Sequence, residues 1–246
     1  MLPADTDAVM EAARILAAGG LVAFPTETVY GLGADATIGT AVARLYAAKG
    51  RPAFNPLIAH VADMAGARAL ATFDANAEKL ATAFWPGPLT LVLARRPHVP
   101  SAVSAGLDTV GVRAPAHPVA QALLAAARVP IAAPSANRYT RVSPTRAEHV
   151  LAQLLDRIDL VIDGGGANVG IESTVLDVSG ARPVILRPGS IARSALEAIA
   201  GPVDVLTREA APRGASPRPA PGMVERHYAP NARLVFVAAE IGRAHV

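Results

Sequence analysis

Apolar and polar positions along this chain follow two different patterns. Residues 7–18 carry apolar side chains on one side at helical spacing, whereas Leu89–Ala94 is an almost unbroken apolar run. The first pattern predicts an amphipathic helix capped by Asp5 or Thr6, because a short oxygen-bearing side chain can accept the N–H groups left free at a helix start. The second predicts a buried strand, since a half-exposed strand would alternate.

The same patterns recur through the first 205 residues. Strands separated by helices indicate an α/β sheet with flanking helices. We expect further helices over residues 40–48, 76–84 and 119–127. We expect the other strands over residues 21–23, 57–61, 109–113, 130–133, 160–162, 175–177 and 184–186.

Polar side chains follow the first strand at the point where a proline ends it. The segment FPTETVYGLG, residues 24–33, presents a Thr-Glu-Thr triplet after Pro25 and then Gly31 and Gly33. Glycines allow a tight turn or a close approach of the backbone to a ligand. We interpret the segment as a candidate ligand cradle, and the alternative is an ordinary polar turn after a strand.

Lysine and arginine side chains occur at the ends of other predicted helices and strands. Lys49 and Arg51 flank a glycine, an arrangement that suits a polyanion because lysine is a point charge and arginine a planar fork for phosphate oxygens. The alternative is a solvated basic loop. Arg113 ends a predicted strand, where it is placed to meet a carboxylate or else to lie on the surface. His60, taken alone, is more typical of a structural histidine.

Polar groups at the strand ends of an α/β sheet converge on one crevice, which is where such sheets bind ligands. No Ser-His-Asp, HExxH or paired-aspartate spacing accompanies them. We therefore expect an anionic substrate and catalysis by positioning and charge stabilisation, without a covalent nucleophile. The pattern of proline or glycine followed by hydroxyl, amide or cation recurs at residues 25–28, 49–60, 109–113, 135–143, 173 and 187.

Composition narrows the class of protein. The chain has 246 residues, of which 52% are hydrophobic and 4% aromatic, so we expect one large domain with a core of small and aliphatic side chains. There is no cysteine, which excludes disulfides, thiolate metal sites and cysteine nucleophiles.

No apolar run approaches the roughly 20 residues of a membrane span, and the N-terminus lacks the pattern of a signal peptide. We expect a cytoplasmic protein. An excess of 23 Lys and Arg over 20 Asp and Glu suits an anionic ligand.

The composition changes near residue 206. We expect a catalytic domain over residues 1–205 and a proline-rich linker over residues 206–231, partly of polyproline character. Residues 232–246 begin a new strand that cannot form a domain alone, so we expect the first strand of a truncated C-terminal domain. The last residues, EIGRAHV, resemble a translated sequencing adapter, and we expect them to be foreign.

The motifs, taken together and in order, resemble one family. Over roughly residues 5–231 the chain is similar to the YrdC-like L-threonylcarbamoyladenylate synthases, in their longer subtype with a linker and a C-terminal domain. The matching motifs are FPTETVYGLG, KGRPAFNPLIAH, WPGPLT, VGVRAP, APSAN followed by VSPT, GIESTV, LRPGS and HYAP.

This resemblance implies a fold and a reaction. The fold is a YrdC-like twisted, mixed, open sheet with flanking helices around a deep, positively charged cavity. The reaction is a nucleotidyl transfer: L-threonine, bicarbonate and ATP, with Mg²⁺, give L-threonylcarbamoyl-AMP and pyrophosphate. This is the first step of forming N6-threonylcarbamoyladenosine (t6A) in ANN-decoding tRNA. The implied partners are the downstream tRNA threonylcarbamoyl transferase machinery and, weakly, tRNA itself. No protein ligands to the metal are implied.

The resemblance also assigns roles to residues. Lys49 and Arg51 correspond to the catalytic pair, and Tyr228 to a linker residue that closes over the nucleotide. The residues that would bind L-threonine are Thr28, His60, Arg113 and Ser173. The residues that would bind ATP are Arg51, Asn55, Thr109, Ser135, Asn137, Ser143, Arg187 and Tyr228.

Two other functions fit parts of the pattern. An RNA-binding YrdC-like module would use a basic concave surface, but no set of stacking aromatic residues lies among the cations. A carbamoyl-transfer domain of the hydrogenase-maturation type also contains a YrdC-like module, but the acylphosphatase and zinc-finger portions expected with it are absent from this sequence.

Overall fold

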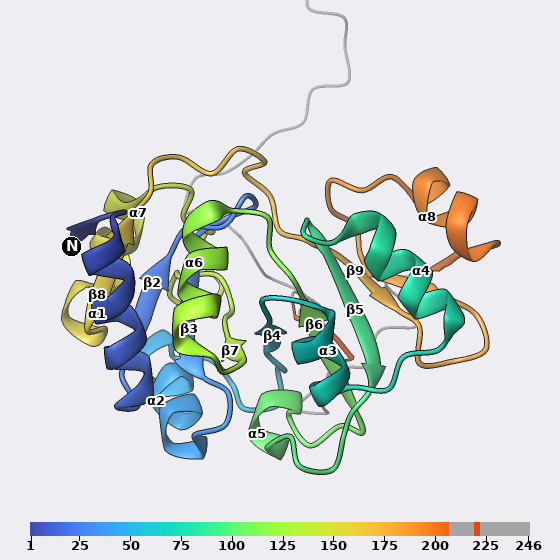
Figure 1. Ribbon diagram of the computed structural model, residues 1–246, viewed down its shortest axis with the longest axis horizontal. Coiled ribbons are helices and arrows are strands. Elements are labelled where there is room, and N and C mark those ends of the chain that lie inside the picture. Colours follow the sequence, from blue (N-terminus) through green and yellow to red (C-terminus); the bar gives the residue numbers. More distant parts are fainter. Residues whose placement is uncertain (207–218, 222–246) are drawn as a thin grey trace, which may run out of the picture.

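A computed structural model describes residues 1–206 and 219–221 (Figure 1). Within these residues the strands form one sheet in the order β1-β8-β2-β3-β7-β4-β6-β5-β9-β10-β11. The strands are β1 (Leu2–Pro3), β2 (Val22–Phe24), β3 (Gly31–Asp35), β4 (Ile58–His60), β5 (Leu89–Ala94), β6 (Thr109–Arg113), β7 (Ile131–Ala132), β8 (Leu160–Asp163), β9 (Thr174–Asp177), β10 (Val184–Arg187) and β11 (Asp204–Val205).

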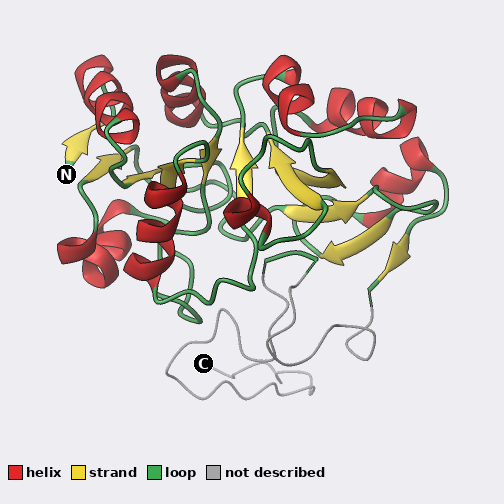
Figure 2. Ribbon diagram, turned by 90° about the horizontal axis from the view of Figure 1, so that it is seen from below, coloured by secondary structure: helices red, strands yellow, loops and turns green. Residues whose placement is uncertain are grey.

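The sheet is mixed and lies between helices. Neighbours β4 and β6 are parallel, whereas β7 runs antiparallel to both β3 and β4. Figure 2 shows helices on both sides of the sheet. The predicted mixed sheet with flanking helices is confirmed. The helices are α1 (Thr6–Ala17), α2 (Gly39–Lys49), α3 (Met64–Leu70), α4 (Ala75–Phe84), α5 (Ser101–Ser104), α6 (Pro118–Ala127), α7 (Ala147–Leu154) and α8 (Arg193–Ala200), with a 3-10 turn at Leu155–Arg157.

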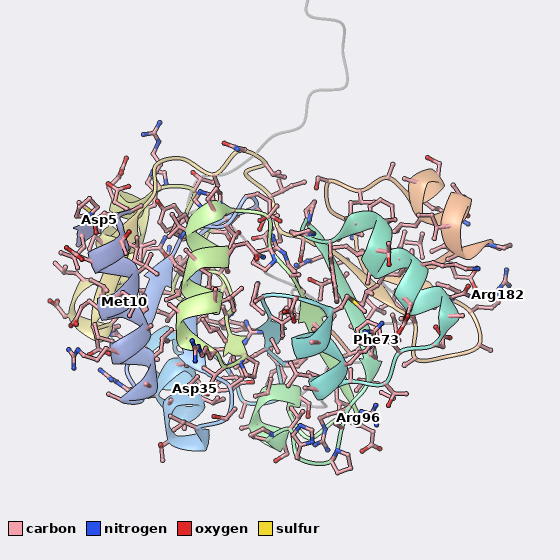
Figure 3. The ribbon with its side chains drawn as sticks, in the orientation of Figure 1. Asp5, Met10, Asp35, Phe73, Arg96 and Arg182 are labelled. Atoms are coloured by element: carbon pink, nitrogen blue, oxygen red, sulfur yellow. The ribbon has the colours of Figure 1, made fainter. Side chains whose placement is uncertain are left out.

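Helix α1 shows how local sequence sets an element. Asp5, at its start in Figure 3, accepts a hydrogen bond from the N–H of Ala8 at 2.8 Å, so aspartate and not Thr6 is the cap. The apolar face of the helix, which includes Leu16, packs beside α6 and over β2, where Phe24 is fully buried. None of the described helices is both long and apolar enough to cross a membrane.

The glycines of FPTETVYGLG lie in a strand and not in a turn. Gly31 and Gly33 belong to β3, a strand that the sequence analysis missed. A Cβ on Gly33 would lie 2.8 Å from Cγ2 of Ile131 and 2.9 Å from Cε1 of Phe24. Gly33 is therefore needed for close packing within the sheet, whereas Gly31 lines the pocket described below.

The C-terminal part of the described chain completes the sheet. Strand β11 pairs in parallel with β10, and α8 packs on α4. Ala220 is buried against Val92 of β5 and Val175 of β9, so residues 219–221 cover this face of the sheet. The rest of the expected linker and the expected C-terminal strand lie outside the described residues.

Gly189, in the LRPGS motif, permits a close contact beside β9. A Cβ at this position would lie 2.3 Å from the amide nitrogen of Thr174 and 2.8 Å from the carbonyl oxygen of Glu172. We expect Gly189→Ala to lower the free energy of unfolding by about 1–3 kcal/mol, because backbone must move to admit the methyl group. Gly180→Ala is the control, since nothing lies within 4 Å of its added Cβ. Urea unfolding curves that coincide for the two variants would contradict this packing argument.

Candidate functional site

One pocket on the sheet gathers many of the predicted residues. It is lined by residues from loops and strand ends that are far apart in the sequence: Thr26, Thr28, Val29, Gly31, Arg51, Ile58, His60, Arg113, Ala133, Pro134, Ser135, Glu172, Ser173, Arg187 and Pro221. All four residues predicted to bind threonine are present, with three of those predicted to bind ATP. The expected convergence of strand ends is therefore observed.

The pocket has two ends because β7 runs against its neighbours. In the pairing of β4 with β6, His60 lies opposite Arg113, so these side chains share the end where both strands finish. Ser135 follows the antiparallel strand β7 and lies toward the beginning of β4, where Arg51 also lines the pocket. His60, Arg113 and Ser173 thus lie at one end, and Arg51 and Ser135 at the other. Thr28 lies in the loop before Gly31, which bridges to Ser135.

Arg113 is held by a buried ion pair. Its Nη2 donates to Oε1 of Glu27 at 2.6 Å, and its Nε donates to the carbonyl oxygen of Gly87 at 3.2 Å. The side chains of Arg113 and Glu27 are 5% and 12% exposed, so this charge pair is shielded from water. Burial lowers the pKa of Arg113 and Glu27 opposes this, and the guanidinium stays charged. It is placed to receive a carboxylate.

Hydroxyl groups surround this end of the pocket. Thr26 donates to the carbonyl oxygen of Val29 at 2.6 Å, so the hydroxyl of Thr28, 2.8 Å away, is the donor in the Thr26–Thr28 pair. Ser173 Oγ lies 2.7 Å from Oγ1 of Thr90. These bonds fix the side chains of Thr28 and Ser173 before any ligand arrives.

His60 is neutral in this environment. Burial and the nearby charge of Arg113 lower the pKa of His60 to about 3. Its Nδ1 lies 3.3 Å from the carbonyl oxygen of Ile58, which can only accept, so we assign the hydrogen to Nδ1. At physiological pH, His60 therefore takes part in hydrogen bonding and not in charge pairing.

Arg51 is anchored by backbone carbonyl groups at the other end. Its Nε donates to the carbonyl oxygen of Asn55 at 3.0 Å and its Nη2 to that of Pro56 at 2.7 Å. Oδ1 of Asn55 is buried and has no hydrogen-bond partner among the described residues. An unpaired buried acceptor is costly, which is consistent with a ligand donor at this position.

Lys49 lies beneath the pocket and does not line it. Its buried Nζ donates to the carbonyl oxygens of Ser135 and Asn137, and Ser135 Oγ donates to Oδ1 of Asn137. Burial, and secondarily the charge of Arg51, lower the pKa of Lys49 well below its usual value. In this structure Lys49 positions the Ser135–Asn137 turn, and its contact with phosphate stays a prediction.

Ser143 and Arg187 both contact the segment before β9. Ser143 Oγ donates to a carboxylate oxygen of Glu172, and Arg187 Nη2 donates to the carbonyl oxygen of Ser173 at 2.9 Å and to its Oγ at 3.1 Å. Arg187 lines the pocket, whereas Ser143 reaches it through Glu172.

Of the last two predicted residues, the structure describes only Thr109. Thr109 begins β6 and does not line the pocket, although its position two residues before Gly111 puts it on the same face as Arg113 and at the Arg51 end. Tyr228 lies outside the described residues. Their nucleotide contacts stay predictions.

The sequence analysis did not assign roles to Glu27, Glu172 and Pro221. Glu27 was visible as the middle residue of the Thr-Glu-Thr triplet, but only the fold shows that it reaches Arg113, 86 positions away. Glu172 is the one carboxylate among the residues that line the pocket. Pro221 had no signal beyond its place in a proline-rich stretch.

Comparisons with known proteins identify the family. A family model described as "Telomere recombination", which covers Sua5, YciO and YrdC proteins, matches residues 14–189. The chain belongs to this family. A second model, described as "Threonylcarbamoyl-AMP synthase, C-terminal domain", matches residues 191–245 and so includes α8 and β11, which complete the sheet.

Individual proteins of the Sua5/YciO/YrdC family are similar to this chain over most of its length. The threonylcarbamoyl-AMP synthase of Pyrococcus abyssi is 48% identical over 227 residues, which cover 92% of this chain and 66% of the relative. The Bacillus subtilis enzyme of the same name is 46% identical over 230 residues, which cover 93% and 66%. This chain thus spans 66% of the length of these relatives. The crystal structure of P. abyssi Sua5 complexed with L-threonine superposes with a TM-score of 0.87 at 47% identity, over 91% of this chain and 66% of that one.

The low pKa of His60 predicts that the free energy of unfolding falls as the pH is lowered. As the pH falls below 6.5, the unfolded chain takes up a proton on His60 while the folded chain does not until about pH 3. The contribution of neutral His60 to the free energy of unfolding is therefore present above pH 6.5 and is lost as the pH falls toward 3. Between pH 7.5 and pH 5 we expect the wild-type free energy of unfolding to fall by about 2 kcal/mol more than that of His60→Gln. Urea unfolding at both pH values measures this, and parallel losses would show that His60 titrates normally.

Proposed function

We propose that this chain acts as an L-threonylcarbamoyladenylate synthase. In this reaction the amine of L-threonine combines with bicarbonate to form a carbamate and water, and a carbamate oxygen then attacks the α-phosphorus of ATP and displaces pyrophosphate. The observation that carries the proposal is a single pocket with buried Arg113, Arg187 and neutral hydrogen-bonding groups at one end and Arg51 at the other. The synthase relatives and the L-threonine complex of P. abyssi Sua5 support it.

The Arg113 end is suited to an amino acid. A charged guanidinium in a water-poor site pairs strongly with a carboxylate. Thr28, Ser173 and neutral His60 offer hydrogen bonds to the hydroxyl and amine of threonine. Because these side chains are already fixed by their own bonds, little ordering remains to be done when threonine binds.

Arg51 and Arg187 would stabilise the phosphate groups. Charge builds up on phosphate oxygens as the carbamate attacks, so fixed cations lower the barrier without reorganising. We propose that the phosphates of ATP carry the Mg²⁺ ion. When bound, Mg²⁺ would neutralise part of the phosphate charge.

Exclusion of water would protect the carbamate and the adenylate. Pro221 lines the pocket and Ala220 is buried beside it, so a piece of the expected linker already closes one side. We propose that Tyr228, further along the linker, closes over the nucleotide, and that the product passes in the cytoplasm to the transferase that forms t6A in tRNA.

The burial of the cations disfavours the RNA-binding alternative. Lys49, Arg51 and Arg113 are 3%, 7% and 4% exposed, too little to meet the phosphodiester backbone of a folded RNA. A small anionic ligand that enters the pocket has no such difficulty. We therefore retain only the synthase proposal.

The proposal is tested by incubating the chain with ATP, Mg²⁺, L-threonine and bicarbonate. We expect pyrophosphate release that requires both threonine and bicarbonate, and threonylcarbamoyl-AMP detected by mass spectrometry. Pyrophosphate release at the same rate with and without threonine would contradict the proposal. So would the absence of threonylcarbamoyl-AMP when each substrate is shown to bind.

The two ends of the pocket predict different defects. Arg51→Ala removes a phosphate donor, so we expect the turnover number to fall about a hundredfold or more. Arg113→Ala removes the carboxylate partner, so we expect the KM for threonine to rise about tenfold to a hundredfold. Arg68→Ala, in an exposed ion pair on α3, is the control for loss of an arginine. Steady-state pyrophosphate assays measure all three, and a variant at either end with wild-type kinetics would remove the role assigned to it.

A further inference from the structure

Glu27 is the carboxylate that pairs with Arg113. It is a buried carboxylate in the loop after β2, and it does not line the pocket. Both of its oxygens are occupied: Oε1 accepts from Nη2 of Arg113 at 2.6 Å, and Oε2 accepts from the N–H of Ala116 at 3.0 Å. Glu27 therefore contacts the residue that would bind substrate and not the substrate.

These contacts leave one part of the guanidinium available. Nε of Arg113 donates to Gly87, and Nη2 donates to Glu27. Nη1 has no hydrogen bond to any described residue, and Arg113 lines the pocket. A guanidinium held at two of its nitrogens cannot turn, so Nη1 is presented in one direction.

The backbone of the same loop holds a second part of the pocket. The carbonyl oxygen of Glu27 accepts from the N–H of Val169 at 2.9 Å, and that of Thr28 accepts from the N–H of Gly170 at 3.0 Å. Three residues further on, Ser173 lines the pocket. The Glu27 residue thus joins the loop that carries Thr28, the end of β6 and the segment that leads to Ser173.

We propose that Glu27 is a positioning residue for recognition of the amino-acid substrate. Its carboxylate fixes the side chain of Arg113 so that Nη1 meets the carboxylate of an α-amino acid. The inference rests on the synthase proposal, because it uses the threonine end of that pocket. An unanchored Arg113 side chain would lose rotamer entropy when it binds substrate, whereas an anchored one has already lost it.

The variant Glu27→Gln tests this role with little change of shape. A glutamine offers one carbonyl oxygen to two donors, so either Arg113 or Ala116 loses its acceptor. Using the full chain and isothermal titration calorimetry, we expect the Kd for L-threonine to rise about tenfold or more. We expect the Kd for ATP to stay within about twofold, since Arg51 and its carbonyl anchors are untouched. Glu78→Gln, in the exposed ion pair with Arg68, is the matched control and should match the wild type for both ligands.

A double-mutant cycle separates positioning from general structural support. If Glu27 acts through Arg113, then adding Glu27→Gln to Arg113→Lys should weaken threonine binding by less than about twofold further. Effects that multiply would overturn the proposal. So would an unchanged threonine Kd in Glu27→Gln, or losses of threonine and ATP affinity of equal size. Glu27→Asp keeps the charge on a shorter side chain, and we expect its threonine Kd to lie between those of the wild type and Glu27→Gln. This variant replaces Glu27→Gln in the test if the glutamine variant does not fold.

Failure of the underlying function gives a different result. If the wild-type chain binds ATP but shows no threonine binding and forms no adenylate, the synthase proposal fails. If the wild type binds threonine and Glu27→Gln binds it equally well, only the role of Glu27 fails.

Discussion

The constraint on which the site depends is the burial of cationic side chains against loop carbonyl groups. A buried charge must be compensated by hydrogen bonds or by an opposite charge. Buried Lys49 and Arg51 donate to backbone carbonyl oxygens, and buried Arg113 donates both to a carbonyl and to Glu27. Half-buried Arg187 also donates to a backbone carbonyl oxygen. Carbonyl dipoles compensate such charges without adding an opposite charge.

This constraint explains why the conspicuous motifs are loops punctuated by proline and glycine. Such segments have carbonyl groups that no strand or helix uses, and they can turn those groups toward a cation. The Ser135–Asn137 turn receives Lys49, and residues 55–56 receive Arg51. The loops are thus shaped by the cations that they hold.

Much of this arrangement could be predicted from the sequence, for physical reasons that differ from residue to residue. Strand β5 matches its predicted range because its nearly unbroken apolar run, interrupted only by Thr90, lies between Pro88 and Arg95. Strand β3 was missed because its glycines suggest a turn, whereas in the fold they make room for Phe24 and Ile131. Strand ends indicated which polar residues meet, but not that they occupy two ends of one pocket.

The parts that sequence could not supply depend on long-range contacts. The partnership of Glu27 with Arg113 joins a loop to the end of β6 through the tertiary fold, and no local pattern encodes it. The placement of Lys49 under the pocket is of the same kind, because its spacing from Arg51 suggested a shared contact with phosphate. A basic residue in a motif can therefore act on the ligand or on the loop that binds the ligand, and only the fold distinguishes these cases.

A second pocket of about 530 Å³ offers a clear alternative location for a ligand. It is lined by α3, α6 and neighbouring residues, among them Ala59, Val61 and Leu124, and none of the predicted site residues lines it. The most direct measurement is a crystal structure of this chain with L-threonine and a non-hydrolysable ATP analogue. Our account predicts the threonine carboxylate on Nη1 of Arg113 and the phosphates toward Arg51 and Arg187. Threonine bound in the second pocket, or bound away from Arg113, would contradict it.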